Sequence, residues 1–145
     1  MKIAVASDHA GFKAKEEIKK YLVSSGYEVR DFGAFSEDSC DYPDFAYPAA
    51  EAVSKKEFDR GIFVCGSGNG MNICANKVKG VRSALVYDKE VAKFAYSDTL
   101  CRIICFGARF MKLDFMKECI DIWLEAAEPT PRHQKRISKI EEKEL

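Results

Sequence analysis

A glycine-rich loop follows a cysteine in the stretch "CGSGNG", which begins at Cys65. Its three glycines, Gly66, Gly68 and Gly70, alternate with two polar residues. Because glycine has no Cβ, backbone N–H groups in such a loop can turn inward and close on an anion. With a helix start behind it, the pattern indicates a site for a phosphate or for the oxyanion of an enolate. The alternative is a tight turn that packs against a neighbouring helix.

The loop matches neither of the common nucleotide-binding motifs. A P-loop requires G-x-x-x-x-G-K-[ST], and no Lys-Ser or Lys-Thr pair follows here. The dinucleotide motif G-x-G-x-x-G requires a glycine where this chain has Met71. The loop therefore predicts an anion site without predicting a nucleotide.

Cys65 ends the apolar stretch "GIFVC", directly before the glycines. A thiolate is stabilised by a nearby helix start and is then a good base or nucleophile. The functional interpretation is a catalytic thiol beside an anion site. The alternative is one more buried cysteine, since cysteine often acts as a small apolar side chain.

Two further groups of residues could bind anions or transfer protons. Asp8 and His9 lie in "SDHAG", after the first apolar stretch, although a lone histidine is more often structural. The stretch "PRHQKR" contains Arg132 and Arg136, four residues apart. On a helix this spacing puts both guanidiniums on one face, where they could hold a phosphate. A solvated basic face is the alternative.

The composition is that of an ordinary globular domain. The chain has 145 residues, of which 47% are hydrophobic and 32% charged, and its formal net charge is zero. This length suits one domain, and without a net positive charge neither nucleic acid nor an anionic membrane is expected as a partner. No apolar run is long enough to span a bilayer, and Asp8 and His9 come too early for a signal peptide. These features predict a cytoplasmic protein.

Six cysteines occur in the chain, and none forms a C-x-x-C pair. Their spacing supports neither a zinc ribbon nor a thioredoxin-type motif. Without a secretory signal, disulfide bonds are not expected. We predict free thiols, most of them buried.

Short apolar stretches alternate with helical patterns along the chain. Strands are predicted at 2–7, 27–32, 61–65, 82–87 and 102–107, and helices at about 11–24, 47–56, 70–77, 88–97 and 113–127. This alternation predicts a single α/β domain over 1–145 with a parallel sheet, and the strand order 2-1-3-4-5 would bring the loops after strands one and three together. The charged tail, about 132–145, is helix-prone but carries little apolar surface. It frays or packs on another surface, such as a second subunit.

Several motifs occur in the order "SDHAGF", "DYPDFA", "CGSGNG", "ANKVKGVRSAL", "FGAR" and "RHQKRI". In this order and spacing they closely resemble the type B ribose-5-phosphate isomerases, which share a family with the galactose-6-phosphate isomerase subunits. The resemblance runs from Met1 to about Ile140. It implies a Rossmann-like three-layer α/β/α sandwich with a five-stranded parallel sheet, and a homodimer that sometimes pairs into tetramers. It also implies that the reaction needs no metal or organic cofactor.

The resemblance further implies an aldose–ketose isomerase of sugar phosphates, most simply of D-ribose 5-phosphate and D-ribulose 5-phosphate. The reaction passes through a cis-enediolate, and a base moves a proton between C2 and C1. In some members the base is a cysteine before the glycines, and in others a glutamate just after them. Here the second position is Met71, which cannot take a proton, so the base is assigned to Cys65.

Other residues receive roles by the same resemblance. The amides of the glycine loop, including those of Gly66, Gly68 and Gly70, would stabilise the enediolate oxygen. The residues assigned to substrate binding are Asp8 for hydroxyl groups, Tyr42 at the pocket border, Ser67 and Asn69 beside the sugar, and His9, Arg109, Arg132 and Arg136 for the phosphate. Arg132 and Arg136 would come from the partner subunit, so the site would lie at the dimer interface.

One segment departs from the family pattern. Members usually carry H-N-[DN]-x-N shortly before "FGxR", and the histidine opens the furanose ring by proton transfer, whereas this chain has "DTLCR". Asp98 takes the place of the histidine, Thr99 of the first asparagine and Arg102 of the last. An ordinary aspartate, ionised at pH 7, could accept the O1 proton but could hardly donate one to the ring oxygen. Asp98 and Thr99 could instead simply cap a chain turn.

Three hypotheses for the function follow. The first is an isomerase of ribose 5-phosphate in which Cys65, Asp98 and Thr99 form the catalytic set. The second is an isomerase of a hexose 6-phosphate, such as galactose or allose 6-phosphate. The third is a sugar-phosphate sensor or a catalytically altered subunit, suggested by the change at Asp98. The retained Cys65 argues against the third, because a pure binder needs no base.

Overall fold

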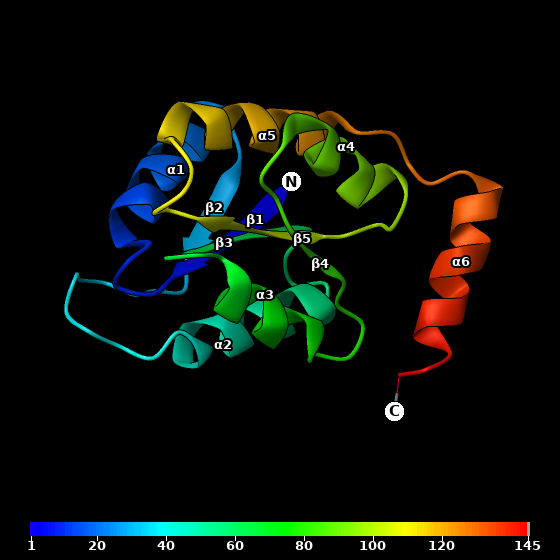
Figure 1. Ribbon diagram of the computed structural model, residues 1–145, viewed down its shortest axis with the longest axis horizontal. Coiled ribbons are helices and arrows are strands. Elements are labelled where there is room, and N and C mark those ends of the chain that lie inside the picture. Colours follow the sequence, from blue (N-terminus) through cyan, green and yellow to red (C-terminus); the bar gives the residue numbers. More distant parts are fainter. Residues whose placement is uncertain (145) are drawn as a thin grey trace.

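The computed structural model describes residues 1–144, and its strands form a five-stranded parallel sheet between two layers of helices (Figure 1). The strands are β1 (Lys2–Ser7), β2 (Glu28–Asp31), β3 (Arg60–Cys65), β4 (Ser83–Leu85) and β5 (Ile103–Gly107). The helices are α1 (Phe12–Ser24), α2 (Pro43–Ser54), α3 (Asn69–Asn76), α4 (Lys89–Ser97), α5 (Leu113–Glu125) and α6 (Pro131–Glu141). The predicted three-layer α/β/α sandwich is confirmed.

The two helical layers receive alternate side chains of each strand. Helices α1, α4 and α5 lie on one face of the sheet, and α2 and α3 lie on the other (Figure 1). In β3, Ile62 and Val64 pack in the first layer, whereas Phe63 and Cys65 pack in the second. This follows from the two-residue period of a strand. The thiol of Cys65 therefore faces the layer that contains the helix after the glycine loop.

The strand order is β2-β1-β3-β5-β4, so the predicted order 2-1-3-4-5 is wrong for its last two strands. All five residues of β5 are buried, whereas β4 has three residues and two of them are only partly buried. A strand that is apolar at every position is best placed inside the sheet, where helices cover both faces. The short strand β4 takes the edge. The pairing of β1 with β3, on which the predicted site depends, is confirmed.

Helix α2 begins at Pro43, four residues before the predicted start at 47, inside a segment predicted to be a loop. Proline suits the first turn of a helix, because its fixed φ is helical and its missing N–H would have no partner there. Asp44 in the same turn also interacts favourably with the helix dipole. As a result Tyr42 lies at the start of a helix and not in the middle of a loop.

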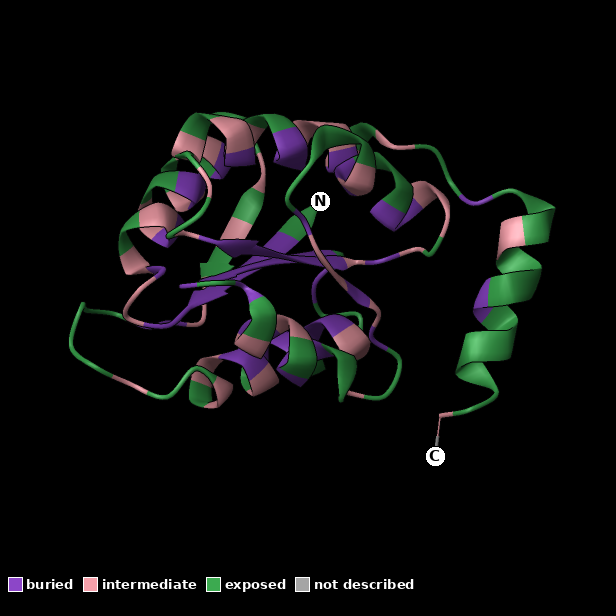
Figure 2. Cartoon of the chain, in the orientation of Figure 1, coloured by how far each residue is buried: buried purple, intermediate pink, exposed green. Residues whose placement is uncertain are grey.

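Helix α6 stands apart from the sandwich in Figure 1, and Figure 2 shows that most of its surface is exposed. Ile137 is its buried residue, and Arg82 Nη1 contacts Glu141 Oε1 at 2.9 Å. The predicted helicity of the tail is confirmed, and its packing on a second subunit stays a prediction.

Two simpler predictions concern the state of the cysteines and the presence of a membrane-spanning helix. All six cysteines are free and all but Cys40 are buried, as predicted. Across residues 1–144, no helix has both the length and the apolar composition that crossing a membrane requires.

Candidate active site

Three neighbouring strands bring several of the predicted site residues to one edge of the sheet. Strands β1, β3 and β5 are parallel, and they end at Ser7, Cys65 and Gly107. Because the carboxyl ends of parallel strands meet at one edge, the loops that follow them converge. We call this side of the sheet the carboxyl edge, and the opposite side the amino edge.

The glycine loop closes around the thiol of Cys65. Gly68 has a φ of +84°, in the left-handed region that favours glycine, and α3 begins at the next residue. The backbone N–H of Gly68 donates a hydrogen bond of 3.2 Å to Cys65 Sγ. The thiol therefore lies against the loop backbone and the start of a helix, as predicted from the sequence.

The other two glycines of the loop leave room for predicted site residues. A Cβ at Gly66 would lie 2.8 Å from Nη1 of Arg109, and a Cβ at Gly70 would lie 2.6 Å from Cζ of Tyr42. Both distances are far shorter than real contacts of a Cβ atom. The absence of side chains thus allows Arg109 and Tyr42 to lie directly against the loop.

Asp8 and His9 approach from the end of β1. The Asp8 N–H donates to the carbonyl oxygen of Val64, the residue before Cys65, at 3.3 Å. Asp8 is buried, and its Oδ1 accepts a hydrogen bond of 3.0 Å from Gly11 N. His9 Nδ1 accepts a hydrogen bond of 3.3 Å from Cys40 N, which leaves Nε2 as the proton-bearing nitrogen of the neutral ring.

Three polar groups at this edge were not predicted. Cys40 holds the ring of His9, while Ser7 Oγ and Asn72 Oδ1 are buried without a hydrogen-bond partner among residues 1–144. Such unpaired polar atoms are uncommon in folded proteins and often occur near functional sites. For Ser7 a signal existed in the sequence, since it is the polar end of an otherwise apolar strand. For Cys40 and Asn72 we find none.

Asp98 and Thr99 lie at the amino edge, away from Cys65 of the same chain. They precede β5, whose last residue, Gly107, pairs with Cys65. The four residue steps along β5 from Ile103 to Gly107 span about 13 Å at the usual rise of a strand. One chain by itself therefore does not bring Asp98 or Thr99 to the thiol.

The side chains of Asp98 and Thr99 have defined partners at this edge. Asp98 Oδ1 lies 3.5 Å from Nε2 of His133, the third residue of α6. Thr99 Oγ1 donates a hydrogen bond of 2.8 Å to the carbonyl oxygen of Ala95, one helical turn earlier. Thr99 thus caps the end of α4, whereas Asp98 pairs with a histidine that the sequence reasoning did not connect to it.

Arg132 and Arg136 lie on one face of α6, as their spacing predicted. Together with Lys135 and Lys139 they line a cavity of about 330 Å³. This basic face lies on the helix that carries His133, the residue in contact with Asp98. Within residues 1–144, no three His, Cys, Asp or Glu side chains gather closely enough to hold a metal ion.

The predicted site residues therefore form two groups. The group at the carboxyl edge comprises Cys65, Gly66, Ser67, Gly68, Asn69, Gly70, Asp8, His9, Tyr42 and Arg109. The group at the other end comprises Asp98, Thr99, Arg132 and Arg136. The first group has a thiol, amide donors and a guanidinium, which suits proton transfer beside an oxyanion.

Known proteins resemble this chain over nearly its whole length. A sequence profile of the family described as Ribose/Galactose Isomerase matches residues 3–140. Ribose-5-phosphate isomerase B of Escherichia coli is 39% identical over 139 residues, which cover 96% of this chain and 93% of that protein. The galactose-6-phosphate isomerase subunit LacB of Clostridium acetobutylicum is 38% identical over 143 residues, covering 98% of this chain and 83% of that protein.

The similarity extends to a solved structure. Ribose-5-phosphate isomerase B of Clostridium thermocellum superposes with a TM-score of 0.96 at 43% identity, covering 98% of this chain and 96% of that chain. The shared region thus includes the sandwich and both groups of predicted residues.

Proposed function

Because this chain belongs to the ribose/galactose isomerase family, a family of sugar-phosphate isomerases, we propose that it converts D-ribose 5-phosphate to D-ribulose 5-phosphate. The observation that carries the proposal is that the thiol of Cys65 accepts a hydrogen bond from Gly68 N in the glycine loop. Met71 stands at the position where other members carry a glutamate, so no carboxylate at that position replaces the thiol. Two relatives are named for ribose 5-phosphate, and the one named for galactose 6-phosphate makes a hexose 6-phosphate the second candidate.

In the proposed reaction the thiolate of Cys65 removes the proton from C2 of the open-chain aldose. The electrons of the C–H bond form the C1–C2 double bond, and negative charge moves onto O1. We assign the stabilisation of this charge to amides of the glycine loop, because donors that the fold holds in place need little reorganisation during the reaction. The thiol then returns its proton to C1, while the proton on O2 moves to O1. The product is the ketose.

A second copy of the chain would complete the site. Arg109 lies against the glycine loop, where its guanidinium would bind the phosphate from one side. Arg132 and Arg136 belong to the other group of predicted site residues, and both are exposed on helix α6. In a homodimer whose two chains run in opposite directions, α6 of each chain could reach the carboxyl edge of the other. A tetramer would pair two such dimers.

Ring opening requires a group that gives a proton to the ring oxygen and takes one from O1. Asp98 stands where the family has its histidine, but Nε2 of His133 lies 3.5 Å from the Asp98 carboxylate. An imidazole can both give and take protons near neutral pH, and a carboxylate partner orients it. We infer that His133 transfers the ring-opening proton and that Asp98 positions it.

The substitution His133→Asn separates ring opening from proton transfer at carbon. Ribose 5-phosphate is mostly cyclic, whereas ribulose 5-phosphate is an open chain. The variant should convert ribose 5-phosphate about 100-fold more slowly, the usual scale of a lost acid–base group. It should still exchange a C1 proton of ribulose 5-phosphate with D2O, followed by NMR, because this step uses Cys65. Ser138→Ala on the same helix is the control. Equal losses in both assays would contradict a ring-opening role.

The substrate is tested with a panel of pentose and hexose phosphates and an assay for ketose formation. We expect kcat/KM for D-ribose 5-phosphate to exceed those for D-galactose and D-allose 6-phosphate by at least about tenfold, a difference of about 1.4 kcal/mol in transition-state binding. A preference for either hexose would favour the second candidate. Binding of several sugar phosphates without any turnover would favour the sensor.

A further inference from the structure

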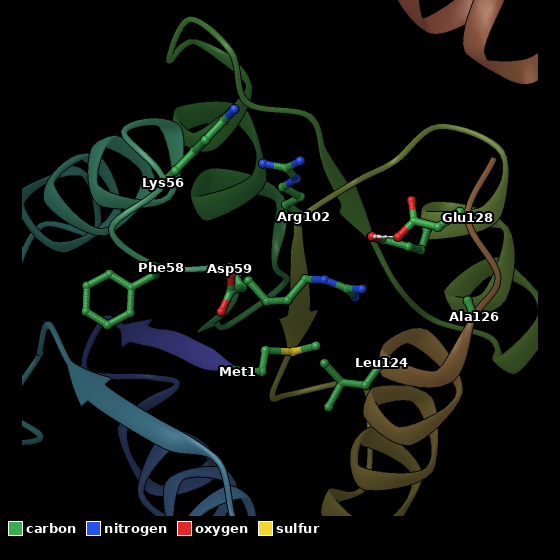
Figure 3. Close-up of a pocket in the computed structure, with 10 residues that line it drawn as sticks. Met1, Lys56, Phe58, Asp59, Arg102, Leu124, Ala126 and Glu128 are labelled. Atoms are coloured by element: carbon green, nitrogen blue, oxygen red, sulfur yellow. Dashed lines mark hydrogen bonds between the residues drawn. The ribbon is translucent and has the colours of Figure 1, made fainter.

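A cavity of about 610 Å³ opens at the amino edge of the sheet, away from Cys65 (Figure 3). Its wall includes Met1 before β1, Arg60 at the start of β3 and Arg102 before β5. The five residue steps of β3 from Arg60 to Cys65 span about 16 Å, so this cavity is separate from the carboxyl edge. The proposed reaction gives it no role.

Three cationic side chains line the cavity. Figure 3 shows the charged ends of Lys56 and Arg102 on one side of it, with Glu128 on the other side. The third cation is Arg60, whose guanidinium lies 3.6 Å from the ring centroid of Tyr96 and 4.7 Å from that of Trp123. The stacking holds the guanidinium plane in a fixed orientation.

Arg60 is only 6% exposed, yet it has no acidic partner of its own. Its Nη1 donates to the carbonyl oxygen of Trp123 at 3.3 Å, and it forms no ion pair among residues 1–144. The two carboxylates of the cavity have other donors. Glu128 accepts a hydrogen bond of 2.7 Å from the Tyr96 hydroxyl, and Asp59 accepts one of 2.8 Å from Lys2 N.

The electrostatics of Arg60 favour an added negative charge. Burial is the largest cause of a lowered pKa at Arg60, and the nearby positive charge of Arg102 acts in the same direction. Interactions with Tyr96 and Glu128 oppose both effects without cancelling them. An anion between the cations would relieve this unfavourable environment, because opposite charges attract most strongly where water is excluded.

We propose that this cavity binds a small metabolite through an oxyanion group, a phosphate or a carboxylate, held by Arg60, Arg102 and Lys56. Guanidinium groups bind both kinds of oxyanion through paired N–H donors. The cavity has the size of ordinary small-molecule sites, and Phe58 and Leu124 give it apolar wall for the rest of the ligand. Arg102 is one of the residues that depart from the family pattern. The site is thus a property of this chain and does not depend on the proposed substrate.

Trp123 is the single tryptophan of the protein and stacks on Arg60, so its fluorescence reports on this cavity. We expect inorganic phosphate or malonate, added at constant ionic strength, to change the emission in a saturable way. Arg102→Gln should raise the apparent Kd by about tenfold or more, the scale of a lost charge-assisted hydrogen bond. Lys20→Gln, which removes the same charge from the exposed face of α1, should leave the Kd unchanged.

Two further measurements distinguish binding in this cavity from binding in the active site, and identify the kind of oxyanion that is bound. Arg136→Gln should leave the Trp123 titration unchanged, because Arg136 does not line this cavity. Tighter saturation by phosphate assigns a phosphate, and tighter saturation by malonate assigns a carboxylate. The proposal is overturned if neither anion gives a saturable change, if Arg102→Gln titrates like the wild type, or if Arg136→Gln abolishes the signal. Thermal unfolding of each variant verifies that it is folded.

Discussion

We expect the replacement of Cys65 by alanine to lower kcat for ribose 5-phosphate by about 10³-fold, within the range of a lost general base. The thiol is the only group of the glycine loop that can accept a proton, since its neighbours are glycine, serine, asparagine and methionine. The KM should change little, because Arg109 and the loop amides remain. The exchange of the C1 proton of ribulose 5-phosphate with D2O should be lost with the turnover.

A matched cysteine controls for effects on the fold. Cys119 is completely buried in the layer of α1, α4 and α5 and lies away from the glycine loop. Cys119→Ala should lower the free energy of unfolding by about 1 kcal/mol, as the loss of a small core group does, with kcat unchanged. If Cys65→Ala turns over at more than a tenth of the wild-type rate, the base is another group.

Mixing two inactive variants tests whether the active site is shared between two chains. Cys65→Ala and Arg136→Gln each damage one of the two residue groups. If subunits exchange at random, about half of the dimers contain one copy of each variant, and one of the two sites in such a dimer is intact. An equal mixture should then recover about one quarter of the wild-type activity.

The control mixture combines Cys65→Ala with Arg109→Gln. Both residues lie at the carboxyl edge of the same chain, so no mixed dimer has an intact site and no recovery is expected. Recovery in this mixture, or its absence in the first mixture once subunit exchange has been demonstrated, would contradict a site built from two chains.

Local sequence patterns were sufficient for the fold class and for the centre of the site. The alternation of apolar strands and helical patterns predicted a parallel sheet, and the pairing of β1 with β3 then brought Asp8 and the glycine loop to one edge. The spacing of Gly66, Gly68 and Gly70 predicted a loop that closes on an anion beside the thiol; the structure shows the Gly68 N–H in contact with Cys65 Sγ, and the anion stays a prediction. These features depend on neighbouring residues and on strand ends, which a sequence displays directly.

The remaining features depend on packing between distant segments. The exchange of β4 and β5 reflects the relative burial of two strands, and the early start of α2 depends on Pro43 and Asp44. Only the folded chain places His133 beside Asp98, which is 35 residues away in the sequence, and stacks Arg60 between Tyr96 and Trp123.

The sequence by itself thus determined the parallel sheet and the position of the glycine loop beside the thiol of Cys65, because the signals for these features lie within a few consecutive residues. The tertiary structure decided that the two groups of predicted site residues lie apart in one folded chain. It also decided that a cationic cavity forms at the amino edge of the sheet. The reason is physical. Periodicity records which face of an element is buried, but it does not record which distant side chains meet on that face.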